Sequence, residues 1–243
     1  MTYCVGLLLD EGMVLLSDTR TNAGLDNIAT YRKMFIFEEP GERVITILTA
    51  GSLSVTQTTI ARLREAIEHP EASEDDSIMQ APTMLNVAEI IGNTLASVRQ
   101  DIDHKMNASK VSVTASMIVA GQRRGGTMRL FLVYPEGNFI EATEDTPFLQ
   151  IGEHKYGKPI LDRVVRMATT LEDGQKAVLL SMDSTLRSNL SVGMPLDLAV
   201  IARDDCKVTL KRRIEKDDPQ FAAMSLAWSE ALRDGFGRIE LIS

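Results

Sequence analysis

The stretch TYCVGLLLDEGMVLLSDTR, residues 2–20, decides the expected fold of this chain. Apolar runs lie on both sides of Asp10-Glu11-Gly12, a short polar connection with a glycine where a positive φ is favourable. This pattern predicts a β-hairpin at the start of the chain.

The register of that hairpin decides which side chains share a face. If the turn is centred on Glu11, Thr2 lies opposite Arg20 and Cys4 lies opposite Asp18, so these side chains point the same way. Asp18 is then the diagonal neighbour of Thr2, within reach of a direct or water-bridged contact. A slip of one residue would separate the two faces.

The rest of the chain alternates between blocks of strands and groups of helices. Runs rich in β-branched residues predict strands, and apolar residues three and four apart predict amphipathic helices. The expected strands cover 33–37, 43–49, 111–120, 128–134, 139–142, 196–202 and 207–213, and the expected helices cover 52–68, 82–107, 154–167, 171–189 and 218–233. Ser52 and Thr170 are the expected N-caps of the first and fourth helices.

Segregated blocks of this kind indicate an α+β fold, in which two antiparallel sheets lie face to face with helices outside. The acidic stretch 68–76 is expected to be a solvated loop. No linker or repeat divides the sequence, and 243 residues suit one large domain. We therefore expect a single domain over residues 1–243.

The composition argues against several classes of function. Lys and Arg number 26 against 34 Asp and Glu, a formal charge of −8, whereas nucleic-acid and anionic-membrane surfaces are basic. No apolar run of about 18 residues and no signal peptide are present, so we expect a cytoplasmic protein. The two cysteines and three dispersed histidines form no disulfide framework or metal motif, and we expect no metal or cofactor.

Thr2 is the first candidate for chemistry. If Met1 is removed, Thr2 carries a hydroxyl and a free α-amine, a nucleophile and a base on one residue. An amine with an unperturbed pKa near 8 accepts a proton at neutral pH, directly or through a water. Each candidate residue alone has an ordinary structural explanation, but together they fit one mechanism.

Three further residues complete that mechanism. Lys33 near the threonine Oγ would lower the proton affinity of the oxygen, and Asp18 would hold the ammonium in place. The Gly51 amide, which precedes a helix, would stabilise an oxyanion. The reaction class is acyl transfer to threonine followed by hydrolysis of the ester.

These residues stand in a pattern that resembles a proteasome β-type subunit: Thr2, GMVLLSDTR over 12–20, Lys33 and Ala50-Gly51-Ser52. The later stretches 118–121 and 191–201 are similar to that family as well. The start MTYCVG and the extra C-terminal helix, about 218–234, more closely resemble Anbu, the bacterial ancestral β-subunit group.

The resemblance implies a four-layer αββα sandwich, the fold of N-terminal-nucleophile hydrolases. It implies Thr2 as nucleophile, Lys33 as the activating residue, Asp18 as its partner and Gly51 as the oxyanion donor. It also implies self-assembly into a ring or spiral homo-oligomer. Unlike many proteasome β-subunits, this sequence has no propeptide before Thr2, so we expect that only Met1 must be removed. An ATPase partner cannot be inferred from it.

Three positions depart from the family pattern. Tyr3 stands where bacterial two-ring relatives usually have a second threonine, and Glu153 replaces a supporting serine in Gly152-Glu153-His154. The third is Leu186, where the family's later Asp-x-x-Ser-Gly motif has its serine. Asp183 keeps the aspartate of that motif, so it is a candidate to orient the Thr2 amine; a polar residue late in a helix explains it equally well.

The function expected from the sequence is a proteasome-like threonine peptidase. Two alternatives stay open: an amidase of the same fold acting on a small or modified amide, and a non-catalytic assembly or binding protein that retains the fold. The identity of the substrate distinguishes the peptidase from the amidase. Whether Thr2 is free and reactive distinguishes an enzyme from the non-catalytic protein.

Overall fold

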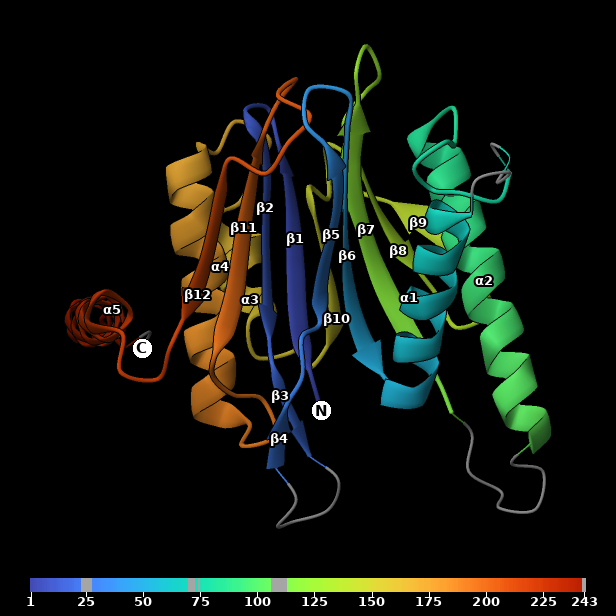
Figure 1. Cartoon of the computed structure of the whole chain (residues 1–243). Coiled ribbons are helices and arrows are strands. Elements are labelled where there is room, and N and C mark those ends of the chain that lie inside the picture. Colours follow the sequence, from blue (N-terminus) through green and yellow to red (C-terminus); the bar gives the residue numbers. More distant parts are fainter. Residues whose placement is uncertain (23–27, 70–72, 74, 106–112, 242–243) are drawn as a thin grey trace.

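Two β-sheets lie face to face between two layers of helices in the computed structural model (Figure 1). The structure describes residues 1–22, 28–69, 73, 75–105 and 113–241. Parts of three expected segments lie outside these residues: the end of the helix expected over 82–107, the start of the strand expected over 111–120, and part of the loop expected over 68–76. The four-layer αββα arrangement confirms the expected fold class.

The first sheet has the strand order β10-β1-β2-β11-β12 and is antiparallel throughout. Its strands are β1 (Tyr3–Leu9), β2 (Gly12–Asp18), β10 (Phe148–Gly152), β11 (Leu196–Ala202) and β12 (Leu210–Ile214). Both strands of the N-terminal hairpin are buried along their whole length. The continuous apolar runs are therefore explained by burial on both faces of the sheet.

The second sheet has the order β5-β6-β7-β8-β9 and is also antiparallel. Its strands are β5 (Met34–Glu39), β6 (Arg43–Gly51), β7 (Ala115–Arg123), β8 (Arg129–Val133) and β9 (Phe139–Glu141). A small two-stranded sheet, β3 (Arg20–Asn22) and β4 (Ile28–Thr30), connects the two large sheets in sequence.

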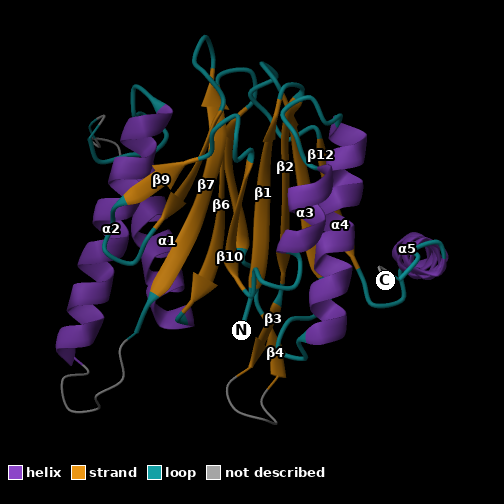
Figure 2. Ribbon diagram, turned by 180° about the vertical axis from the view of Figure 1, so that it is seen from behind, coloured by secondary structure: helices purple, strands orange, loops and turns teal. Residues whose placement is uncertain are grey.

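Helices cover the outer face of each sheet (Figures 1 and 2). The second sheet is covered by α1 (Leu53–Glu68) and α2 (Met84–Lys105), and the first by α3 (Lys158–Val164) and α4 (Leu171–Ser188). The last helix, α5 (Pro219–Gly237), stands at the side beyond β12. No described helix is long and apolar enough to pass through a membrane.

The expected elements are largely present, with three differences. The short strands β3 and β4 lie before residue 33, where no strand was expected. The strand β10 was not expected, although it forms an edge of the first sheet beside β1. The helix expected over 154–167 is shorter, because α3 begins only at Lys158 and ends at Val164. The Thr170 side chain caps α4 by accepting from the Asp173 amide, whereas the Ser52 side chain forms no cap hydrogen bond.

The predicted register of the N-terminal hairpin is wrong by one residue. Leu9 lies opposite Gly12 and Cys4 lies opposite Ser17, so Asp10 and Glu11 alone form the loop. Gly12 has the expected positive φ, +149°, and the structure shows a second reason for a glycine here. A Cβ at Gly12 would lie 2.2 Å from the carbonyl oxygen of Ile201, so its absence lets β11 approach β2 closely.

Candidate active site

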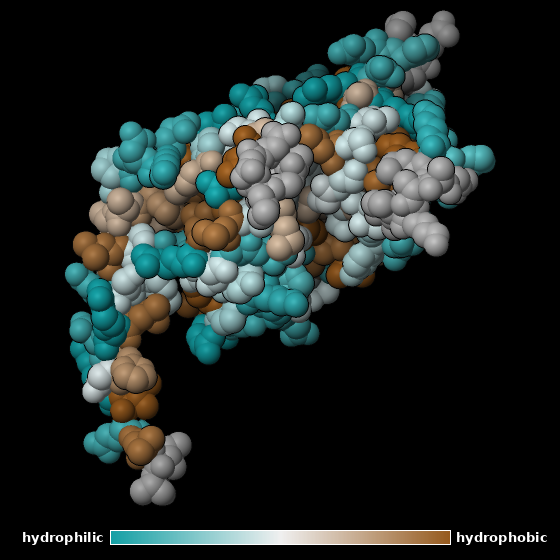
Figure 3. Space-filling model, turned by 90° about the horizontal axis from the view of Figure 1, so that it is seen from below, coloured by the Kyte–Doolittle hydropathy of each residue, from teal (hydrophilic) through white to brown (hydrophobic). Residues whose placement is uncertain are grey.

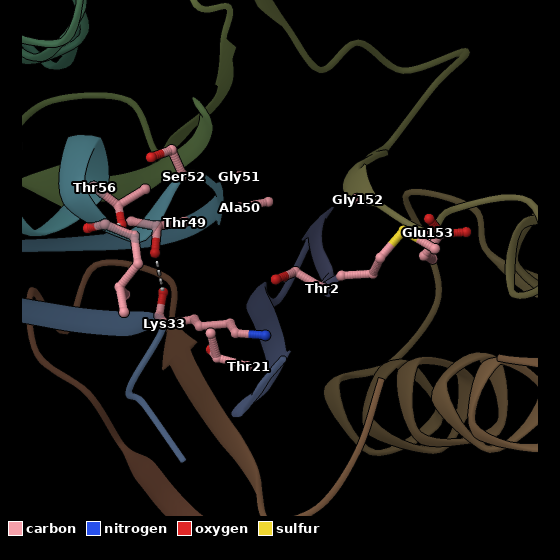
Figure 4. Close-up of a pocket in the computed structure, with 12 residues that line it drawn as sticks. Thr2, Thr21, Lys33, Thr49, Ala50, Gly51, Ser52, Thr56, Gly152 and Glu153 are labelled. Atoms are coloured by element: carbon pink, nitrogen blue, oxygen red, sulfur yellow. Dashed lines mark hydrogen bonds between the residues drawn. The ribbon is translucent and has the colours of Figure 1, made fainter. Parts of the chain in front are cut away.

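A cavity of about 560 Å³ opens beside Thr2, at the ends of β6 and β10 (Figure 4). It contains three of the five predicted site residues, Thr2, Lys33 and Gly51, and a fourth, Asp18, is bonded to Lys33 beside it. The full lining is Met1, Thr2, Thr21, Lys33, Thr49, Ala50, Gly51, Ser52, Leu53, Thr56, Gly152 and Glu153. Residues from both sheets and from α1 therefore meet here.

Thr2 is held by its backbone on two sides. Its carbonyl oxygen accepts a hydrogen bond of 2.7 Å from the Glu153 amide, just beyond β10. The next amide, that of Tyr3, donates to Asp18 Oδ1 at 3.2 Å. Thr2 is 8% exposed, and in Figure 4 its hydroxyl points into the same space as the Lys33 amine.

Lys33 and Asp18 form a buried ion pair. Lys33 Nζ donates to Asp18 Oδ1 at 2.8 Å and to the Arg20 carbonyl oxygen at 2.6 Å. Lys33 is 5% exposed and Asp18 is fully buried. A buried ammonium is retained only with partners of this kind, because its desolvation is costly. The pair therefore fixes the position of the amine in the cavity.

Backbone amides from two distant segments also hold the Asp18 carboxylate. The Tyr3 amide binds Oδ1, and the Gly193 amide donates to Oδ2 at 3.3 Å. Burial raises the pKa of Asp18, and the charge and hydrogen bond of Lys33 together with these two amides oppose that rise. Two backbone amides and Lys33 thus hold Asp18 beside the site. The shared strand face expected from the wrong register does not place it there.

Gly51 lies at the junction of β6 and α1. Its φ of +109° is favourable only for glycine, and a Cβ there would lie 2.3 Å from the Thr114 carbonyl oxygen. The chain turns here from a strand into a helix and lines the cavity. An amide near a helix N-terminus is suited to stabilise negative charge.

The side-chain contacts of Asp183 are with α4 and α5, outside the cavity. On α4 its carboxylate accepts from the Ser225 hydroxyl at 2.7 Å and from Arg187 at 3.0 Å. Ser225 belongs to α5, so these bonds join the two helices. Asp183 is not among the residues that line the cavity, and its expected contact with the Thr2 amine remains a prediction.

Sequence reasoning missed the supports behind Thr2. The Tyr3 side chain is fully buried; its hydroxyl is 2.6 Å from the Ser181 hydroxyl and accepts from Gln150 at 2.6 Å. Burial raises the pKa of Tyr3 to about 12. Gly152 has a φ of +81°, and a Cβ there would lie 1.9 Å from the Thr2 carbonyl oxygen. Of these supports, only Tyr3 was indicated by the sequence, through its position next to Thr2.

No group of three or more His, Cys, Asp or Glu side chains suited to a metal ion occurs within the described part of the chain. The chemistry available in the cavity is that of a hydroxyl, an ammonium paired with a carboxylate, and backbone amides. Those are the groups that acyl transfer to a hydroxyl requires.

The αββα layers and a threonine beside a buried lysine–aspartate pair define a proteasome-type subunit of the N-terminal-nucleophile hydrolase fold. The family model described as "Proteasome subunit" matches residues 2–201. A search of curated proteins found no match.

Solved structures of Anbu proteins match the whole chain. A Gly-1 mutant of Anbu from Hyphomicrobium sp. strain MC1 is 47% identical with a TM-score of 0.93, each chain covered at 100%. Anbu (ancestral beta-subunit) from Yersinia bercovieri is 40% identical with a TM-score of 0.91, covering 99% of this chain and 98% of that one. A helical assembly of the Anbu complex from Pseudomonas aeruginosa is 42% identical with a TM-score of 0.92, with the same coverage. The chain therefore belongs to the proteasome subunit family, within its Anbu group.

Proposed function

We propose that this chain is a threonine-type hydrolase that cleaves peptide amide bonds after removal of Met1 exposes the Thr2 α-amine. The observation that carries the proposal is the buried Lys33–Asp18 pair, whose amine lines the same cavity as the Thr2 hydroxyl. Met1 is 59% exposed, so a processing enzyme can reach it. Family membership supports this reading.

The first half of the reaction forms an ester. The Thr2 α-amine takes the proton of the Thr2 hydroxyl, directly or through a water, and Oγ attacks the substrate carbonyl carbon. The oxyanion that develops is stabilised by the Gly51 amide. The C–N bond then breaks, the proton passes to the leaving amine, and the acyl group stays on Oγ.

The second half reverses the proton path. A water gives its proton to the α-amine and attacks the ester carbonyl, with the oxyanion at the Gly51 amide again. The C–O bond breaks, Oγ regains a proton, and the carboxylic acid leaves. Hydrolysis of one amide is complete and Thr2 is restored.

Lys33 acts on the oxygen through its charge. An ammonium close to Oγ stabilises the developing alkoxide, lowering the free energy needed to deprotonate the hydroxyl. Asp18 and the Arg20 carbonyl oxygen both accept hydrogen bonds from that ammonium and together keep it in one position. Both roles require the geometry that burial and backbone contacts impose.

We further propose that copies of this chain assemble with one another. The Pseudomonas aeruginosa relative is described as a helical assembly. In this chain α5 carries exposed apolar side chains at Leu226, Leu232 and Phe236, a surface that a second copy would cover.

Covalent labelling tests the hydrolase proposal. The protein is treated with a threonine-directed electrophile, and the intact mass is measured for wild type and Thr2→Ala. The expected result is loss of the Met1 mass and one adduct in wild type, with no adduct in Thr2→Ala. Retained Met1, or an adduct that does not depend on Thr2, would contradict the proposal, and hydrolysis of small amides but not of peptides would favour the amidase.

A further inference from the structure

A second cavity, of about 320 Å³, adjoins the candidate active site. It shares Leu53 and Thr56 with the first cavity, so the two lie on either side of the same α1 residues. Its remaining lining comes from the segment before and within β5 and from α1: Tyr31, Arg32, Phe35, Gln57, Ile60, Ala61 and Arg64. Together the two cavities make a groove that leads away from Thr2.

One stripe of α1 forms the floor of that groove. Its lining positions 53, 56, 57, 60, 61 and 64 recur at the three- and four-residue spacing of a single helix face. Leu53 and Arg64 are 64 − 53 = 11 residues apart, about 16 Å along a helix. An extended peptide covers that distance in about five residues, so the groove matches the residues that flank a cleaved bond.

Two arginines mark the far part of the groove. Arg32 and Arg64 are exposed, and neither forms an ion pair with any carboxylate in the residues that the structure describes. The cavity that they line contains no Asp or Glu. The Arg64 guanidinium lies 5.6 Å from the centre of the Phe35 ring. Stacking of this kind leaves the in-plane N–H groups of the guanidinium available to an anion.

Arg62 provides the contrast on the same helix. It points away from the groove, and its guanidinium binds Asp101 of α2 at 2.7 Å. Although the chain has a formal charge of −8, the second cavity is lined by two cations and by no carboxylate. A carboxylate is the planar anion that a guanidinium fork recognises best.

We propose that the groove binds an acidic side chain of the substrate, so that Arg32 and Arg64 make the enzyme prefer peptides with Glu or Asp within about five residues of the cleaved bond. The inference rests on the proposed function, because it names a substrate class for that same site. The arginines determine specificity through charge and take no part in the reaction at Thr2.

Matched peptides test the inference. Peptide pairs differ only by Glu or Gln at one position, which is moved through five residues on each side of the cleaved bond, and kcat/KM is measured for each. At one position the Glu peptide is expected to be about tenfold better at low salt, as for a charge-assisted pair. In Arg32→Gln/Arg64→Gln the ratio is expected to fall to within about twofold. In about 1 M salt, where the Debye length is about 3 Å, it is expected to fall likewise.

Arg62→Gln is the matched control, since it removes one arginine from the same helix outside the groove. It is expected to keep the Glu preference. A Glu preference that survives in Arg32→Gln/Arg64→Gln, or the absence of one at every position, would overturn the inference.

Binding to Thr2→Ala separates this inference from the hydrolase proposal. Anisotropy of the same labelled peptides is measured with Thr2→Ala alone and with Arg32→Gln/Arg64→Gln added. Tighter binding of the Glu peptide that the arginine changes remove would support the groove even if no Thr2-dependent cleavage is found. Equal binding of the Glu and Gln peptides would reject it even if cleavage occurs.

Discussion

At the scale of single residues, the Lys33–Asp18 pair dominates the site. Lys33 has two oxygen partners, and Asp18 accepts from Lys33 and from two backbone amides, so the pair is well satisfied despite its burial. Removing one member leaves the other charge buried without a partner, a larger effect than removing both. This asymmetry allows the proposed catalytic role of Lys33 to be tested separately from its structural role.

Lys33→Ala is expected to abolish Thr2 labelling and to lower the free energy of unfolding by about 3–5 kcal/mol, because the Asp18 carboxylate loses its counter-charge. The folded protein is still expected to form. Adding Asp18→Asn removes the unpaired charge and should recover part of the stability without recovering the labelling. Denaturant unfolding and intact-mass measurements check both statements; labelling that returns in the double variant would show that Lys33 does not activate Thr2.

Tyr3→Phe removes a buried hydroxyl that binds Ser181 and Gln150. At neutral pH the change is expected to cost about 1–3 kcal/mol, because both partners lose a hydrogen bond in the interior. The measurement is urea unfolding of wild type and Tyr3→Phe.

The same variant has a defined pH dependence. The pKa of Tyr3 is raised from 10.0 to about 12, so between these values the unfolded chain loses this proton and the folded chain keeps it. The free energy of unfolding therefore falls as pH rises through this window, and below it the contribution is fully present. Tyr3→Phe should lack this part of the slope; identical slopes in the two proteins would contradict a raised Tyr3 pKa.

At the scale of elements, the end of β10 positions Thr2. Gly152 pairs with Tyr3, and the following amide holds the Thr2 carbonyl. The positive φ of Gly152 and the 1.9 Å approach of an added Cβ to the Thr2 oxygen leave no space for a side chain. The edge strand that sequence reasoning missed is therefore part of the site.

Gly152→Ala is expected to displace Thr2 and to reduce its labelling strongly, because the new Cβ collides with fixed backbone. Gly41→Ala is the matched control: its φ of +85° is similar, but an added Cβ meets nothing within 4 Å. The control should show only backbone strain, about 1–2 kcal/mol, with labelling intact. Thermal unfolding and labelling rates make the comparison, and equal loss of labelling in both variants would point to general destabilisation.

At the scale of the whole molecule, α5 is weakly attached and apolar. Ser225 is its one buried residue, and that residue bonds to Asp183 and Arg187 of α4. Figure 3 shows the C-terminal end of the molecule projecting from the body with apolar side chains exposed. Phe236 is 81% exposed, unusual for a side chain of this size unless another surface covers it.

Leu232→Asp/Phe236→Asp is expected to shift the protein to smaller species, because charge replaces the apolar surface that we propose to be shared between copies. Sedimentation velocity measures the distribution of species. Ile140→Asp is the control, since Ile140 is 46% exposed on β9, at the far side of the molecule from α5 (Figure 1). Unchanged sedimentation of the α5 variant would show that this helix does not mediate assembly.

The sequence alone determined the hairpin, the order of strand and helix blocks, and the candidates Thr2, Lys33, Asp18 and Gly51. Periodicity and turn residues predict the elements, because they report which faces are buried and where the chain turns. The four candidates follow instead from the chemistry of their groups and from the resemblance to the family pattern. The cap of α4 at Thr170 was equally local and was correct.

Only the tertiary structure decided what each buried face meets. The register of β1 and β2 follows from a two-residue loop, and β10 joins a strand almost 150 residues earlier in the chain. The partner of Asp183 was likewise decided by the tertiary structure, since its carboxylate accepts a hydrogen bond from Ser225 of α5. Periodicity states that a side chain is buried but does not name its partner, and partners distant in sequence are brought together only by the packing of the four layers.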